Sequence, residues 1–372
     1  MSIGNIIIPI KIILLNHFFY DIWERKELNN ILKINSGRDY KQLNSGSIPV
    51  YGTGGYMLSV NDKLSDTDAV GIGRKGTIDK PLYLKAPFWT VDTLFYCTSK
   101  ENSDVKFIYL LFQIINWKRY DESTGVPSLS KNTISNIKTY VPKIKEQDYI
   151  SKLFFSLDNT LQLHERKYEE LTLIKKALLQ KLFPKKDGFK PEVRYKNFND
   201  AWEQRKLGEV VERFDNLRIP VTSSKREKGI TPYYGANGIQ DYVQGYTHDG
   251  EFVLVAEDGA NDLQNYPVHY VNGKVWVNNH AHVLQGKNKM VDNLFLVNAI
   301  KQIKIETYLV GGSRAKLNAD VMMKLPIKVP TFNEQQRLGK YFARLDSLIT
   351  LHQCKLEKLK QLKKFLLQNM FI

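Results

Sequence analysis

One stretch of this sequence occurs twice, at residues 142–183 and 330–371, and the two copies align without a gap at an offset of 188 residues. This repetition constrains the fold more than any single motif does, because a duplicated sequence predicts two structural units of the same kind. The positions shared by the copies are charged, polar, aromatic and aliphatic. They include Pro142/Pro330, Glu146/Glu334, Gln147/Gln335, Asp158/Asp346, His164/His352, Lys175/Lys363 and Phe183/Phe371.

Both copies have the pattern of a long helix that packs along one seam. Apolar residues recur in alternating steps of four and three residues, and one position of this series in each copy is not apolar. After the initial proline of each copy, Gly339 is the only Gly or Pro in either. The predicted seam residues are Ile150, Phe154, Leu157, Leu161, His164, Tyr168 and Leu171 in the first copy, and Leu338, Phe342, Leu345, Ile349, His352, Leu356 and Leu359 in the second.

A helix of this length would extend about 55–60 Å, so it needs a partner. The simplest partner is the other copy, and the globular segment between them provides a return path that favours antiparallel pairing. The alternative is two amphipathic helices that each cover a globular core. His164 and His352 are expected to be polar members of the seam, where such residues can fix the register of two helices.

The duplication includes the globular segment that precedes each helix, since IPVYGTGGY (48–56) corresponds to ITPYYGANGI (230–239). The interiors of both segments mix short β-type runs with one helical pattern, at 105–116 and 291–301, which predicts the α+β class. Asn272-Gly273 predicts a hairpin turn, because both residues tolerate positive φ. The expected divisions are an irregular lead (1–20), a first globular domain (21–141), a first long helix (142–183), a linker (184–199), a second globular domain (200–329) and a second long helix (330–372).

The charge of the chain favours a polyanionic partner. The net charge is +15 over 372 residues, although ribosomal, membrane-surface and DNA-binding proteins share this property. The two cysteines, Cys97 and Cys354, lie far apart in the sequence and fit a reduced, cytoplasmic protein. The apolar run from Ile3 to Leu15 is too short to span a membrane, so no membrane partner is expected.

The quoted motifs are similar to those of type I restriction–modification DNA specificity subunits. The opening DAWEQRKLGE (200–209), the stretch YYGANGI (233–239) and the repeated helix ending carry this resemblance. It implies two target recognition domains that each read half of a split site in double-stranded DNA. It also implies a helix pair that holds the domains apart and docks methyltransferase subunits. The duplication leads us to expect two methyltransferase copies, together with motor-nuclease restriction subunits. The lead-in KPEVRYKNF (190–198) has no counterpart in IPIKIILLNHFF (8–19) before the first domain, where the chain departs from the family pattern.

Catalysis by the chain itself is not expected. The sequence has no Asn-Pro-Pro-aromatic loop for a flipped base and no Gly-x-x-x-x-Gly-Lys-Ser/Thr loop for a nucleotide phosphate. Glu257, Asp258 and Asp262 cluster without a motif for metal-dependent cleavage. His280 and His282 alternate in an expected strand, but a metal site would need further ligands. No cofactor is therefore expected, and the histidines are interpreted as a structural pair or as base and phosphate contacts.

Arg, Lys, Asn and Gln side chains in Gly-rich loops are the candidates for DNA contact, because they can pair with base edges while loops present them from a rigid scaffold. A structural assembly protein with incidental charge is the alternative function, and a methylating enzyme that acts alone is a weaker one. The candidates are Arg38, Lys41, Arg74, Lys75, Lys80 and Lys131 in the first half, and Lys225, Arg226, Asn237, Asn261, Asn278, Asn279, Arg314 and Lys316 in the second.

Overall fold

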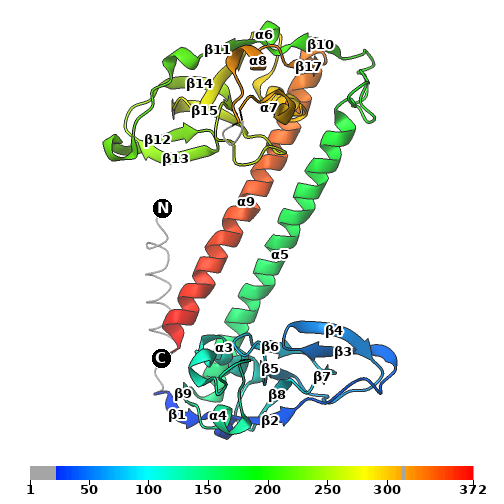
Figure 1. Cartoon of the computed structure of the whole chain (residues 1–372), viewed down its shortest axis with the longest axis vertical. Helices are drawn as coiled ribbons and strands as arrows, with labels where there is room; N and C mark the ends of the chain where they lie inside the picture. The colour runs from blue at the N-terminus through cyan, green and yellow to red at the C-terminus, as the bar shows by residue number, and fades with distance from the viewer. Residues whose placement is uncertain (1–21, 312–314, 372) are drawn as a thin grey trace. The chain divides into compact units, whose positions relative to one another are not determined.

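The structure is a computed structural model that describes residues 22–311 and 315–371. The chain divides into two compact units (Figure 1). The described part of the first unit is 22–164 together with 355–371, and the second unit is 165–354. Each unit thus contains one globular part and a portion of both long helices. The sequence-based segmentation instead assigns each long helix to a segment of its own, and it stays a prediction.

The described residues of the first unit have their strands in three small sheets. Their orders are β1-β9, β2-β8-β5-β6 and β4-β3-β7. The strands are β1 (Glu24–Glu27), β2 (Leu32–Ser36), β3 (Ser45–Gly52), β4 (Gly55–Val60), β5 (Ala69–Gly73), β6 (Leu82–Leu84), β7 (Trp89–Thr90), β8 (Leu94–Ser99) and β9 (Lys138–Val141). The helices before the long one are α2 (Leu28–Ile31), α3 (Val105–Ile114), η1 (Trp117–Tyr120) and α4 (Lys131–Ser135).

The second unit repeats this plan with a larger sheet, whose order is β11-β16-β14-β15-β12-β13, and with the pair β10-β17. The strands are β10 (Glu203–Lys206), β11 (Val211–Arg213), β12 (Lys228–Gly235), β13 (Gly238–Val243), β14 (His248–Ala256), β15 (Val268–Val277), β16 (Ala281–Gly286) and β17 (Pro326–Val329). The helices are α6 (Leu207–Val210), η2 (Asp215–Leu217), η3 (Ser223–Lys225), α7 (Asn293–Lys301), η4 (Ile305–Tyr308) and α8 (Ala319–Met322).

One proline accounts for the divided sheet of the first unit. In the second unit β15 pairs with β14 along its length and with β12 at Trp276 and Val277. In the first unit these two roles fall to β6 and β7, and Pro87 lies between them. Proline has no N–H to donate to a neighbouring strand, so it interrupts the ladder that β15 continues.

The predicted hairpin at Asn272-Gly273 is wrong. Both residues lie inside the continuous strand β15, where they pair with Glu251 and Gly250 of β14. Gly273 does have positive φ (88°), as does Gly250 opposite it (142°). The sequence signal therefore marks a pair of glycines facing each other in an unbroken ladder, and the long partner strand β14 outweighs the local turn preference.

The two long helices are α5 (Ile144–Leu182) and α9 (Phe332–Met370), each of 39 residues. In the first unit Phe154 of α5 contacts Phe371, and Asp158 forms an ion pair with Lys363 at 2.6 Å. As the residue numbers rise along α5, the numbers of their partners in or next to α9 fall. The two helices are therefore antiparallel.

The same pattern occurs in the second unit. Lys175 of α5 forms an ion pair with Asp346 of α9, and Phe183 contacts Phe342. Lys175 and Lys363 fill the slots that the apolar pattern skips in the two copies. Each therefore reaches the aspartate that stands at the same place in the other helix.

The predicted seam residues lie on the less exposed side of each helix. Those with buried side chains are Ile150, Phe154, Leu338, Phe342, Leu345 and Leu356, and those that are half-buried are Leu157, Leu161, His164, Tyr168, Leu171, Ile349, His352 and Leu359. Several also contribute to the globular cores, because Phe154 belongs to the core of the first unit and Phe342 to that of the second. The seam and the core-covering alternative therefore both describe part of the packing.

A buried glutamine fastens the start of each long helix to its globular part. Gln335 donates from Nε2 to the Pro330 carbonyl at 2.8 Å and accepts at Oε1 from the Asp292 N–H at 3.0 Å. Gln147 makes the same two contacts, to the Pro142 carbonyl and from the Asp104 N–H. The repeated glutamine of the sequence thus has one structural role in both halves.

Gly339 permits the close packing of α7 on α9. A Cβ at this position would lie 2.7 Å from the backbone nitrogen of Phe295.

No helix among residues 22–311 and 315–371 is long and apolar enough to cross a membrane. The apolar run from Ile3 to Leu15 lies outside the described residues.

Candidate nucleic-acid interface

The loop that follows β5 is held by three backbone contacts in the first unit. The Arg74 N–H donates to the Thr93 carbonyl at 2.8 Å, and the Arg74 carbonyl accepts from the Leu129 N–H at 2.9 Å. Lys75 forms an isolated β-bridge with Ser128. These contacts fix the backbone of both cationic residues at the end of a buried strand.

The loop that follows β14 has the same three contacts in the second unit. The Glu257 N–H donates to the His280 carbonyl at 2.8 Å, its carbonyl accepts from the Leu317 N–H at 2.7 Å, and Asp258 bridges to Lys316. The pairing of β5 with β8 and of β14 with β16 extends this correspondence into the sheets. The equivalent residues are Arg74/Glu257, Lys75/Asp258, Thr93/His280, Phe95/His282 and Ser128/Lys316.

The first strand-end site, formed by Arg74, Lys75, Phe95 and Lys131, is cationic. The Arg74 guanidinium lies 6.0 Å from the centre of the Phe95 ring, and the Lys131 ammonium lies 5.8 Å from the same centre. An aromatic face attracts cations, so one buried ring gathers two of them. Within the described part of the chain, none of the three basic side chains forms an ion pair with a carboxylate.

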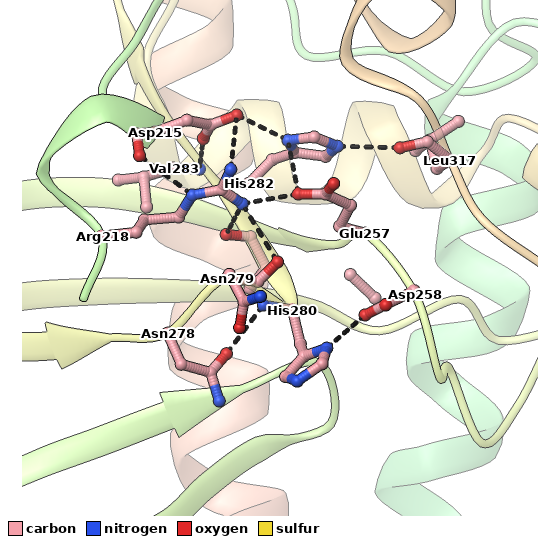
Figure 2. A network of polar contacts seen from close by, with 12 residues as sticks. Asp215, Arg218, Glu257, Asp258, Asn278, Asn279, His280, His282, Val283 and Leu317 are labelled. Atoms are coloured by element: carbon pink, nitrogen blue, oxygen red, sulfur yellow. Dashed lines mark hydrogen bonds and ion pairs between the residues drawn. The ribbon is translucent and has the colours of Figure 1, made fainter. Parts of the chain in front are cut away.

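The second strand-end site, formed by Glu257, Asp258, His280 and His282, has two carboxylates in its loop, and the Arg218 guanidinium lies beside Glu257 (Figure 2). Glu257 accepts from Arg218 at 2.6 Å and from Lys316 at 2.8 Å. Burial acts to raise the pKa of Glu257, but the hydrogen bonds from Lys316 and Arg218 outweigh it and hold the pKa below its usual value.

His282 is the buried centre of the second strand-end site. Its Nε2 lies 2.8 Å from the Leu317 carbonyl, and its Nδ1 lies 2.7 Å from the Asp215 carboxylate. The Leu317 carbonyl can only accept a hydrogen bond, which places a proton on Nε2, and Nδ1 faces the Asp215 carboxylate. Burial acts to raise the pKa of Asp215, but hydrogen bonds from His282 and the Val283 N–H hold it below its usual value.

Asp215, Glu257 and His282 offer donor atoms that all lie within 4.8 Å of one another, as a metal site would require. Arg218 already occupies this place, since it donates to Glu257 at 2.6 Å and to the Ala281 carbonyl at 2.9 Å. A metal ion would have to displace this guanidinium, so the geometry favours an ion-pair network.

The two histidines of the sequence motif belong to different contacts. β16 begins at Ala281, so His280 lies outside the strand, and its side chain is 48% exposed. His280 Nδ1 lies 2.5 Å from Asp258 Oδ1, whereas His282 lies in the buried network (Figure 2). The structure therefore does not bring the two rings together as a pair.

Comparison with known proteins gives the family. Residues 20–173 and 199–361 match the profile described as "Type I restriction modification DNA specificity domain". The match covers most of the chain and repeats once in each half. The chain belongs to this family.

The curated relatives agree with this assignment. The chain is 45% identical over 146 residues to "Putative type I restriction enzyme specificity subunit S.HindORF215P" of Haemophilus influenzae, a match that covers 39% of the chain and 38% of that relative. It is 24% identical over 281 residues to "Type I restriction enzyme MjaVIII specificity subunit" of Methanocaldococcus jannaschii, covering 66% of the chain and 64% of the relative. The chain thus matches less than two thirds of the length of these relatives.

The fold is also found in a solved structure. The crystal structure of the type I restriction–modification system S subunit from M. genitalium superposes with a TM-score of 0.77 at 15% identity. The alignment covers 95% of this chain and 97% of the other. The family assignment and this likeness confirm the predicted architecture of two α+β globular parts with two long helices.

Within this specificity-domain fold, several predicted DNA contacts are already engaged elsewhere. Arg226 stacks 4.1 Å from the centre of the Tyr233 ring, and its side chain is largely buried. The Asn237 side chain donates to the Gly259 carbonyl and accepts from the Asn261 N–H, so it holds the loop after β14 in place. In this conformation these two side chains support other residues.

Asn278 is buried, and its side-chain oxygen accepts from the His280 N–H at 2.8 Å. Lys316 keeps 46% of its side chain exposed beside Glu257. The remaining candidates have exposed side chains or lie outside the described residues. Arg38, Lys41, Arg74, Lys75, Lys80, Lys131, Lys225, Asn261 and Asn279 are exposed or half-exposed, and Arg314 lies outside the described part.

Asp215 and Arg218, which complete the second strand-end site, are not among the candidates predicted from the sequence. They lie about forty or more positions before their partners Glu257 and His282, and no spacing rule joins such distant residues. The contact of Asp258 with His280 was missed for the same reason. The pairing of β14 with β16 brings Asp258 to His280, and the pairing of β11 with β16 brings Asp215 and Arg218 to His282.

Proposed function

We propose that the chain is the non-catalytic DNA specificity subunit of a type I restriction–modification complex. The observation that carries this proposal is the family match, which occurs once in each half of the duplicated chain. Each globular domain, residues 21–141 and 200–329, would read one half of a bipartite site in double-stranded DNA. The net charge of +15 supports binding to a polyanion.

The proposed partners are two methyltransferase subunits together with motor-nuclease restriction subunits. The repeated contacts of the long helices support this number, since Asp158–Lys363 and Lys175–Asp346 are the same ion pair in the two halves. Duplicated surfaces can accept two copies of one partner. The chain itself would need no cofactor and would act as the part that selects the sequence.

The experiment is co-expression of the full chain with a methyltransferase subunit of its own system, followed by mapping of adenine methylation across the host DNA. We expect methylation at one split motif with a constant gap between its halves. A soluble complex that methylates nothing new would contradict the proposal. Expression of the methyltransferase subunit without the chain is the control.

The first domain lacks a counterpart of the lead-in that precedes the second domain, and this difference gives the methylation experiment a further outcome. Arg194, in the lead-in of the second domain, forms a bidentate ion pair with Glu334 at 2.8 and 2.7 Å. Leu15 stands at the corresponding position before the first domain when Trp23 is aligned with Trp202. Methylation that follows only one half-site would indicate that the first domain does not read DNA.

A further inference from the structure

The two strand-end sites occupy the same place in their domains but differ in charge. Arg74 and Lys75 follow β5, whereas Glu257 and Asp258 follow β14 with the same backbone contacts. Since the backbone is matched, the side chains alone make the difference. A position that keeps its geometry and reverses its charge is suited to recognising different groups in the two domains.

The first strand-end site can donate hydrogen bonds but has no acceptor among its charged groups. Arg74 and Lys131 converge on the Phe95 ring, where two like charges repel each other unless an electron-rich partner lies between or beside them. Guanine presents two acceptors, O6 and N7, in the major groove, and Arg or Lys is the usual partner for them. The chemistry of this site therefore suits guanine.

The second strand-end site presents an exposed acceptor. Asp258 has 37% of its side chain exposed and contacts His280 through one carboxylate oxygen, which leaves acceptor capacity on a group with about four lone pairs. Carboxylates accept from the exocyclic amino group of cytosine, while they repel phosphates. The Arg218 and Lys316 cations around Glu257 lower that repulsion.

We propose that the strand-end sites are base-reading positions of the two domains, with Arg74 and Lys75 reading guanine acceptors and Asp258, oriented by His280, reading an exocyclic amino group. The proposal rests on the proposed function and adds residues and base chemistry to it. Glu257, His282, Asp215 and Arg218 form the buried support beneath the second reader. Lys131 is a positioning residue that shares the Phe95 ring with Arg74.

The test uses the complete chain assembled with its methyltransferase subunits. Binding is measured by competition with duplexes that carry the mapped split motif with one base pair changed at a time. The first variant is Arg74→Gln with Lys75→Gln, and its control is Lys33→Gln with Lys85→Gln, which removes the same charge from exposed positions of the same unit. The second variant is Asp258→Asn, with Asp249→Asn as control.

We expect the first variant to lose discrimination by about tenfold or more at a G·C pair in one half-site only. Asp258→Asn should lose a similar discrimination at one pair of the other half-site, because the amide replaces an acceptor with a donor of the same shape. Both controls should keep the wild-type pattern. The unaffected half-site in each variant shows that the complex is folded and bound.

Two outcomes would overturn the proposal. Uniform weakening across all duplexes with a shallower salt dependence would assign these residues to phosphate contacts. Unchanged binding and discrimination would place both sites away from the DNA. If the wild-type complex itself showed no sequence preference, the proposed function would fail, and that result is distinguishable because it appears before any substitution.

Discussion

The second strand-end site shows how the partners of a buried charged side chain stabilise it. Glu257 is buried, yet Arg218 and Lys316 both donate to its carboxylate, and Arg218 also lies beside Asp215. A buried charge without partners would destabilise the folded chain by on the order of several kcal/mol. The network therefore depends on all its members, and removal of one carboxylate leaves a cation without compensation.

Asp215 should make the second unit sensitive to acid. Because its pKa in the folded chain lies below the unfolded value of about 3.9, the unfolded chain binds the proton first. The stabilisation is therefore present above that value and is lost as pH falls further. Asp215→Asn should lower the melting temperature at pH 7. The difference from wild type should shrink as the pH falls from about 5 to about 3. Thermal unfolding against pH measures this, with Asp249→Asn as control.

Gln335 should contribute more to the free energy of unfolding than other polar residues of α9. It is 1% exposed and hydrogen-bonds to three backbone groups, at Asp292, Pro330 and Met290. Gln335→Leu keeps the volume but leaves these groups unsatisfied, which should cost roughly 2–3 kcal/mol in the free energy of unfolding. Urea unfolding would measure the loss. Gln353→Leu, at an exposed position of the same helix, should change stability by about 0.5 kcal/mol or less.

At the scale of elements, the long helices combine a coiled-coil seam with attachment to globular cores. The apolar pattern skips a slot in each copy, and the structure fills it with Lys175 or Lys363, each paired with an aspartate of the other helix. A charged pair within an apolar seam specifies which positions of the two helices face each other. The repeated sequence thus contains its own register signal.

The Lys175–Asp346 pair should therefore show a measurable coupling. Lys175 has only 16% of its side chain exposed, so water screens the pair less than a surface pair. A double-mutant cycle with Lys175→Met and Asp346→Asn should give a coupling of about 1 kcal/mol. The Asp148–Lys152 pair on the exposed side of α5 is the control, with an expected coupling of about 0.3–0.5 kcal/mol. Equal couplings would contradict a special role for the seam pair.

For the whole molecule, the excess of positive charge should appear as a salt dependence of DNA binding. Net charge of +15 predicts that binding releases counterions from the duplex. If the assembled complex makes about 6–10 phosphate contacts, its affinity should fall by about 10³–10⁵ between 50 and 200 mM salt. Binding measured across this range tests the expectation. A flat salt response would favour a structural role in which the charge is incidental.

The sequence alone determined the duplication, the long helices and the mixed character of the globular parts. Periodicity and an ungapped offset are local properties, so residues such as Phe154 and Phe342 could be placed on the less exposed helix face without any tertiary information. The family resemblance followed from the same repeated motifs. The helix α3 begins where predicted and ends two residues early, at Ile114, while α7 begins two residues late, at Asn293, because the Asp292 side chain caps it there.

Only the tertiary structure decided how distant segments meet. The Asn272-Gly273 signal became part of an unbroken strand because β14 supplies a partner along its full length. Arg226 and Asn278 are largely buried, and the exposed Asn237 side chain is hydrogen-bonded to the loop after β14, whereas Arg74 and Lys75 stayed exposed. The equivalence of Arg74 with Glu257 depends on strand register and backbone hydrogen bonds between segments far apart in sequence. The sequence already sets 70–81 against 253–267, but only these contacts, which carry no local pattern, show that the two loops keep the same backbone geometry while their charges differ.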